Sequence, residues 1–179
     1  MINDIKEVLY SEVVLSERVS TLAKAIEADY LGKDLLVIGV LKGANIFMCD
    51  LIRKINLPIQ IDFIAASSYG SSTESSGVVK IIKDLDYSIE GKHVLIVEDI
   101  IDTGLTLKYL EENFKSRKPA SLEICTLLDK PERRKADIKV KYVGYEIPDE
   151  FIVGYGIDYA EKYRNLPYVA TLKPEVYQK

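Results

Sequence analysis

The stretch Val94-Leu-Ile-Val-Glu98-Asp99-Ile100-Ile101-Asp102-Thr103-Gly104-Leu105-Thr106-Leu107 decides the fold that we expect for this chain. It opens with four consecutive apolar residues, which predict a strand buried on both faces, as in a parallel sheet. Leu107, Leu110 and Phe114 then recur at helical spacing, which predicts a helix directly after the loop. The pattern indicates a strand–loop–helix unit whose loop lies at the carboxyl end of a sheet, where open α/β folds bind their ligands.

The loop combines three carboxylates with residues that suit an anion. Residues 103–106 offer backbone N–H groups and two hydroxyls at a helix N-terminus, which is a natural anion site. Glu98 and Asp99 can accept hydrogen bonds from vicinal sugar hydroxyls, which leaves Asp102 free near a reacting base. A phosphorylated sugar meets both demands. The alternative is a plain helix cap whose acids are only solvated.

The bulk properties indicate one globular domain. The chain has 179 residues, 47% of them hydrophobic, and a net charge of -4, which argues against nucleic acid as an obligate partner. No basic-then-apolar segment opens the chain, and no apolar run approaches the ~18 residues of a membrane span. We therefore expect a soluble, cytoplasmic protein without a membrane partner. Cys49 and Cys125 lack Cys-x-x-Cys spacing and are expected to be buried, reduced thiols.

Apolar strands alternate with helical patterns along the chain. Ser16 is a suitable N-cap for a helix, and residues 35–41 form a second apolar strand. A helix is expected over 44–55, and a third strand follows with apolar residues alternating over 59–63. This order predicts an α/β fold with a parallel sheet and crossover helices.

The opening stretch resembles the pyrophosphorylated-ribose signature of type I phosphoribosyltransferases: a hydrophobic strand, two acids, two apolar residues, then Asp-Thr/Ser-Gly-x-Thr. The resemblance implies a parallel β-sheet core flanked by helices, with a small hood formed by C-terminal and N-terminal segments. The expected single domain, 1–179, has its core at about 16–145 and its hood mainly at about 146–179 plus the N-terminal residues. The implied ribose and 5′-phosphate contacts are Glu98, Asp99, Asp102, Thr103, Gly104, Leu105 and Thr106.

Two further segments resemble the diphosphate site of that family. Lys42-Gly43 follows a buried strand, where a lysine beside a glycine can bind an anion, although a bare turn has the same pattern. Residues 66–77 are rich in Ser, Gly and Thr and indicate a mobile lid, with a plain linker as the alternative. Their Ser68-Tyr69 pair resembles the dipeptide that covers the leaving group. The implied diphosphate contacts are Leu41, Lys42, Gly43, Ser68, Tyr69 and Arg164.

The C-terminal third resembles the base-binding hood of the hypoxanthine(-guanine) branch of the family, in its compact bacterial form. By that resemblance Lys130 reads a 6-oxo group, Phe151 stacks on the purine, and the backbone of Ile152 reads its edge. An aromatic ring suits any base, because every base has a π face, but an ordinary core aromatic is the alternative for Phe151. Residues 132–135 are expected to be a solvated charged turn. The resemblance also implies Mg²⁺, held by Glu98, Asp99 and Asp158.

The resemblance implies a purine-salvage enzyme that transfers the 5-phosphoribosyl group from phosphoribosyl diphosphate to hypoxanthine or guanine. The products would be IMP or GMP and diphosphate. Asp102 is the candidate general base, with a helix-cap carboxylate as the alternative. The resemblance implies a homodimer or homotetramer whose other partners are small molecules. Two functions stay open: a transferase for xanthine or another base, and a nucleotide-sensing RNA-binding regulator, which the net charge does not favour.

Overall fold

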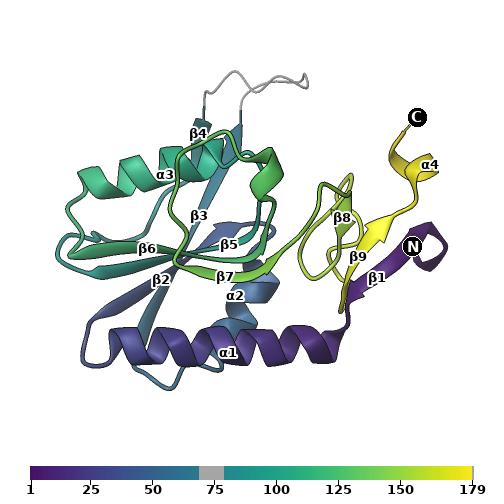
Figure 1. The fold of residues 1–179 in the computed structure, drawn as a ribbon. Coiled ribbons are helices and arrows are strands. Elements are labelled where there is room, and N and C mark those ends of the chain that lie inside the picture. Colours follow the sequence, from purple (N-terminus) through teal and green to yellow (C-terminus); the bar gives the residue numbers. More distant parts are fainter. Residues whose placement is uncertain (69–78, 179) are drawn as a thin grey trace.

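The computed structural model describes residues 1–68 and 79–178, except the side chain of Ser68. Its centre is a six-stranded sheet in the order β4-β3-β2-β5-β6-β7 (Figure 1). All neighbours pair in parallel except β3 and β4, which pair antiparallel. The strands are β2 Leu35–Leu41, β3 Ile59–Ser68, β4 Val79–Lys83, β5 His93–Ile101, β6 Ser121–Asp129 and β7 Tyr142–Glu146.

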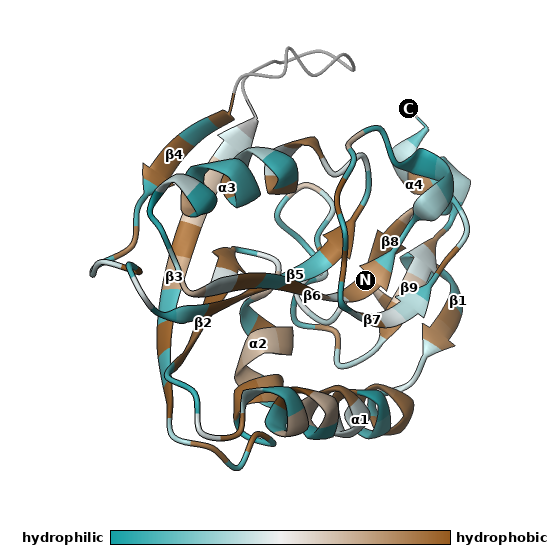
Figure 2. Cartoon of the chain, turned by 60° about the vertical axis from the view of Figure 1, so that its left-hand side comes forward, coloured by the Kyte–Doolittle hydropathy of each residue, from teal (hydrophilic) through white to brown (hydrophobic). Residues whose placement is uncertain are grey.

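Helices cover both faces of this sheet. Helices α1 (Glu12–Tyr30) and α2 (Asn45–Ile52) lie on one face and α3 (Leu105–Ser116) on the other (Figure 1). The central strands are strongly hydrophobic, as their brown colour in Figure 2 shows. Their side chains pack into two apolar cores, one on each face of the sheet. The parallel α/β architecture expected from the sequence is confirmed.

A second, smaller sheet joins the two ends of the chain. Its order is β1-β9-β8, all antiparallel, with β1 at Ile5–Tyr10, β8 at Ile152–Val153 and β9 at Val169–Leu172. This is the hood that the sequence predicts. Short helical turns accompany the sheets: η1 Ile2–Asp4, η2 Pro131–Arg133 and α4 Pro174–Tyr177.

Two helix boundaries differ from the expectation. Helix α1 begins at Glu12, not at Ser16, because Ser11 is the N-cap and its hydroxyl accepts a hydrogen bond from the Val14 N–H at 3.4 Å. Buried Leu15 extends the apolar stripe upstream of the expected start. Helix α2 ends at Ile52 and not at residue 55, since the N–H groups of Lys54 and Ile55 donate tighter i,i+3 hydrogen bonds to the last helical turn.

The prediction of two buried thiols is wrong for one cysteine. Cys125 lies in β6 and is fully buried, but Cys49 is exposed. It lies on the outer face of α2, together with exposed Asn45 one turn earlier, whereas Phe47 and Met48 face the core. The apolar neighbours in sequence therefore belong to a different face of the helix.

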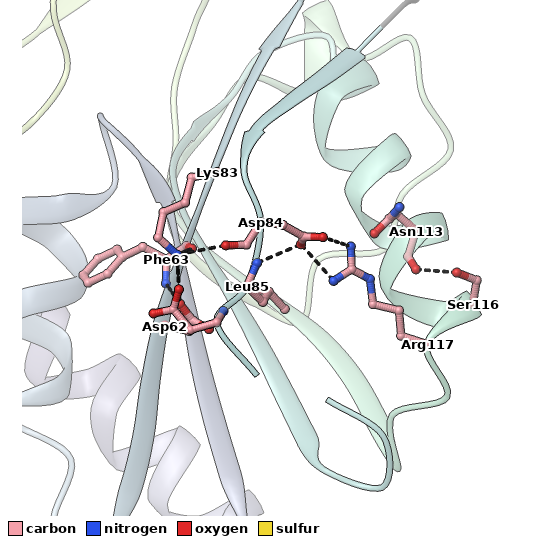
Figure 3. A network of polar contacts seen from close by, with 9 residues as sticks. Asp62, Phe63, Lys83, Asp84, Leu85, Asn113, Ser116 and Arg117 are labelled. Carbon is pink, nitrogen blue, oxygen red and sulfur yellow. Dashed lines mark hydrogen bonds and ion pairs between the residues drawn. The ribbon is translucent and has the colours of Figure 1, made fainter. Parts of the chain in front are cut away.

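A polar network fastens the edge of the large sheet to α3 (Figure 3). Buried Asp62 accepts hydrogen bonds from the Phe63 and Asp86 N–H groups at 2.7 and 2.8 Å. Arg117 donates two hydrogen bonds to Asp84, at 2.8 and 2.9 Å, in a bidentate pair.

In residues 1–68 and 79–178, no helix is both long and apolar enough to cross a membrane.

Candidate active site

The carboxyl ends of β2, β5 and β6 bring the predicted site residues to one edge of the sheet. Strand β5 lies between β2 and β6, with Val97 opposite Gly39 and Ile101 opposite Asp129. The turn after β2 carries Leu41, Lys42 and Gly43, the turn after β5 carries residues 102–104, and Lys130 follows β6. Parallel strands share this edge, so three segments far apart in sequence meet there.

Glu98 and Asp99 lie within β5, because the strand extends beyond its apolar run to Ile101. Asp99 is buried, and its carboxylate accepts a hydrogen bond from the Ile100 N–H at 2.7 Å. Burial raises the pKa of Glu98 well above its ordinary value, and the nearby Asp99 charge raises it further. Burial also raises the pKa of Asp99. Two desolvated carboxylates side by side form a place that a cation or hydroxyl donors stabilise.

The next turn has the geometry of an anion-binding loop. Gly104 has a φ of 77° and is the N-cap of α3. The N–H groups of the first turn, which begins at Leu105 and Thr106, have no acceptor within the helix and can therefore bind an anion. A Cβ on Gly104 would come within 3.0 Å of Arg134 Cδ and Ile138 Cδ1. The loop is held from the other side as well, since the Thr103 carbonyl accepts hydrogen bonds from the backbone N–H groups of residues 135 and 136.

Four of the six predicted diphosphate residues, Leu41, Lys42, Gly43 and Arg164, lie near one another at a second turn. The Leu41–Lys42 peptide is cis, and Lys42 Nζ pairs with Glu161 Oε2 at 3.0 Å. Arg164 lies near the same glutamate and binds Asp158 Oδ1 at 2.8 Å. Lys42 and Arg164 are therefore neighbours across Glu161, although they come from opposite ends of the sequence.

Glycines allow these two loops to touch. Gly156 has a φ of 103°, and a Cβ on it would overlap the carbonyl oxygen of Gly43. Arg164 fixes the same loop by donating a hydrogen bond to the Gly156 carbonyl at 2.8 Å. The close backbone contact aligns the Lys42 turn with the loop that carries Asp158.

A cavity of about 520 Å³ opens beside these loops and gathers the remaining predicted residues. Asp102 and Lys130 line it from the large sheet, and Phe151, Ile152 and Asp158 line it from the hood side. Lys130 is almost fully buried and donates a hydrogen bond to the Glu150 carbonyl at 2.6 Å. Ile152 is buried in β8, opposite Thr171 of β9. One cavity thus contains an acid, an ammonium donor and an aromatic ring.

The structure also shows residues that the sequence analysis did not assign to the site. Arg133 is exposed, as expected for a solvated charged turn, and it also pairs with the Asp102 carboxylate at 2.5 Å and with Asp149 Oδ2 at 3.1 Å. Ile157 and Tyr177 line the same cavity. No local sequence pattern reveals them, because each contributes through contacts with segments distant in the chain.

The expected lid and the expected metal site are described only in part. Ser68 ends β3, but its side chain, Tyr69 and the rest of the expected lid through residue 77 lie outside the described residues. Among residues 1–68 and 79–178, no three His, Cys, Asp or Glu side chains are grouped as a metal site. Glu98 and Asp99 still suit Mg²⁺, which is commonly bound by one or two carboxylates together with substrate phosphates.

The fold, with its candidate site at the carboxyl edge of a parallel sheet, is that of a phosphoribosyltransferase. The family model of the phosphoribosyl transferase domain matches residues 12–160, and the chain belongs to this family of enzymes.

The chain is similar over almost its whole length to several bacterial members of this family. The hypoxanthine-guanine phosphoribosyltransferase of Staphylococcus aureus (strain Mu50) is 59% identical over 177 residues, 99% of either chain. That of Bacillus subtilis (strain 168) is 57% identical over 178 residues, also 99% of either chain. The crystal structure of a hypoxanthine phosphoribosyltransferase from S. aureus superimposes with a TM-score of 0.98 at 58% identity, covering 100% of this chain and 97% of the other.

Proposed function

We propose that this enzyme transfers the 5-phosphoribosyl group from phosphoribosyl diphosphate to hypoxanthine or guanine, forming IMP or GMP and diphosphate. The observation that carries this proposal is the cavity of about 520 Å³, where Asp102, Lys130 and Phe151 surround one space next to the α3 N-terminus. The names and the near-complete coverage of the bacterial relatives support the same substrates.

Each group has a role in this proposal. The α3 N-terminus binds the 5′-phosphate through Thr103 to Thr106, and Glu98 and Asp99 bind the ribose hydroxyls. Lys130 donates a hydrogen bond to the 6-oxo group, and Phe151 stacks on the purine. Ile152, paired through its backbone to β9, presents peptide groups to the purine edge.

The reaction forms the C1′–N9 bond and breaks the bond between C1′ and the diphosphate oxygen. Asp102 accepts the proton that the purine loses from N7. In the structure Asp102 is paired with Arg133, so the purine N–H must share or replace this partner. Lys42 and Arg164 stabilise the departing diphosphate from the side of the Leu41–Gly43 turn.

Mg²⁺ is the proposed metal, and when bound it would supply positive charge to stabilise the diphosphate. Glu98 and Asp99 would hold it together with substrate oxygens; Asp158, the third expected ligand, pairs with Arg164 and is not grouped with them among the described residues. Two adjacent carboxylates, of which Asp99 is buried, are a donor set that fits a cation at this place.

The test is a turnover assay with hypoxanthine, phosphoribosyl diphosphate and MgCl₂, with IMP and diphosphate measured separately. We expect equal amounts of the two products, and none of either after addition of excess EDTA. Diphosphate release without IMP would contradict phosphoribosyl transfer to the base. Undiminished turnover in EDTA would contradict the metal assignment.

A further inference from the structure

The C-terminal turn packs directly beside the purine cavity. Helix α4 follows β9 in the hood (Figure 1), and the Lys173 N–H just before it donates a hydrogen bond to the Asp4 carbonyl at 2.9 Å. Val176 and Tyr177 pack against the small apolar core of the hood, which contains Val153 and Leu172. The turn is thus held by the N-terminal segment and by the apolar core of the hood.

Tyr177 stacks on Phe151, the ring assigned to the purine. The two ring centroids are 4.6 Å apart and the planes are inclined by 21°. Tyr159 contacts Phe151 edge-on, at 5.2 Å and 86°. Phe151 nevertheless keeps 37% of its surface exposed, and both Phe151 and Tyr177 line the cavity. The stack therefore supports the ring and still leaves part of it open to a ligand.

We propose that Tyr177 is a positioning residue for the purine, because it stacks on one face of Phe151 and so fixes the plane of the ring on which the base stacks. This proposal rests on the function proposed above. An exposed phenylalanine supported on one face loses less rotational freedom when a base binds to it, so part of the ordering cost is met before binding. Offset stacking between rings at this separation is favourable in itself.

The test compares the wild type with Tyr177→Ala, Tyr177→Phe and a matched control, Tyr87→Ala, whose side chain is 83% exposed. Steady-state rates are measured with hypoxanthine varied at saturating phosphoribosyl diphosphate, and then with the two substrates exchanged. Tyr177→Ala should raise the KM for hypoxanthine by about two- to tenfold, the range expected for one aromatic pair. The kcat and the KM for phosphoribosyl diphosphate should stay within about twofold of the wild type. Tyr177→Phe and Tyr87→Ala should behave like the wild type.

Three results would overturn the proposal. An unchanged KM for hypoxanthine in Tyr177→Ala would mean that the stack does not position the base. A lowered KM would mean that Tyr177 competes with the base for Phe151. Equal losses in both KM values and in kcat, with a lower thermal midpoint, would mean a purely structural role. Failure of the wild type to convert any 6-oxopurine is a separate outcome, which would overturn the proposed function and this proposal with it.

Discussion

The Asp99 carboxylate lies directly against Gly43, so that a Cβ at position 43 would overlap Asp99 Oδ2. This contact joins two parts of the site that the sequence shows only as separate motifs. It explains why glycine follows Lys42: the turn must pass over a buried acid of the neighbouring strand. The spacing between the two loops is therefore set by the lack of a side chain at residue 43.

Gly43→Ala should disable the enzyme without unfolding it. The added methyl group must displace either Asp99 or the Lys42 turn, and a misplacement of about 1 Å in a reactive geometry can cost about 10²-fold in rate. We expect a comparable loss in kcat/KM, with a far-ultraviolet circular dichroism spectrum like that of the wild type. The control is Gly91→Ala, where no atom lies within 4 Å of the new Cβ, so only stability should change. Equal activity of Gly43→Ala and the wild type would refute this explanation.

Asp102→Asn tests the proposed proton transfer. The amide is nearly isosteric with the carboxyl group and leaves the Arg133 side of the site filled, but it cannot accept the purine proton. We expect the rate constant of the chemical step, measured in single-turnover assays, and the steady-state kcat both to fall by ~10²–10⁴-fold. A near-normal kcat would reduce Asp102 to a helix-cap carboxylate.

The Asp84–Arg117 pair of Figure 3 predicts a pH-dependent stability. Hydrogen bonds from Arg117 hold the pKa of Asp84 below its ordinary value. A carboxyl group of this kind stabilises the fold above its unfolded pKa of about 3.9, and the contribution is lost as the pH falls through the lower folded pKa. Because Asp84 is half exposed, Asp84→Asn should cost at most about 1 kcal/mol of unfolding free energy near neutral pH.

Urea titrations at several pH values, followed by circular dichroism, measure this effect. The difference between Asp84→Asn and the wild type should shrink as the pH falls below about 4. A difference that grows on acidification would have the wrong sign for this pair.

The two cysteines should differ sharply in reactivity. Cys49 is exposed on α2, whereas Cys125 is fully buried in β6 and burial raises the pKa of its thiol. A disulfide reagent such as DTNB should therefore modify one thiol per native chain quickly and the second only after unfolding in guanidinium. Cys49→Ser should abolish the fast phase. Fast modification of both thiols in the native protein would contradict the packing of β6.

Much of the fold was predictable because it rests on local patterns. The apolar run Leu35–Leu41 is the strand β2 as expected, and Leu107, Leu110 and Phe114 are the buried face of α3. The start of α1 could not be predicted, because Ser11 and Ser16 are both suitable caps and only tertiary packing of Leu15 distinguishes them. Motif residues converged on one edge of the sheet since parallel strands place their carboxyl ends together.

Contacts between distant segments were beyond the reach of the sequence. The charged turn at 132–135 gave no sign that Arg133 would pair with Asp102, and nothing near Tyr177 points to Phe151. The exposure of Cys49 depends on which face of α2 meets the core, which a short apolar helix leaves undetermined. These features follow from tertiary geometry, and two of the residues concerned, Arg133 and Tyr177, line the proposed purine cavity.

The central claim is that the enzyme selects 6-oxopurines, and a competition assay among hypoxanthine, guanine, xanthine and adenine tests it most directly. Each base is supplied with phosphoribosyl diphosphate and MgCl₂, and the nucleotides are separated and counted against diphosphate. We predict IMP and GMP as the main products, and no AMP, because the Lys130 ammonium would face the 6-amino group of adenine, donor against donor. Preferential formation of AMP would contradict the claim. Preferential formation of the nucleotide of xanthine, which also carries a 6-oxo group, would instead contradict the proposed use of hypoxanthine and guanine.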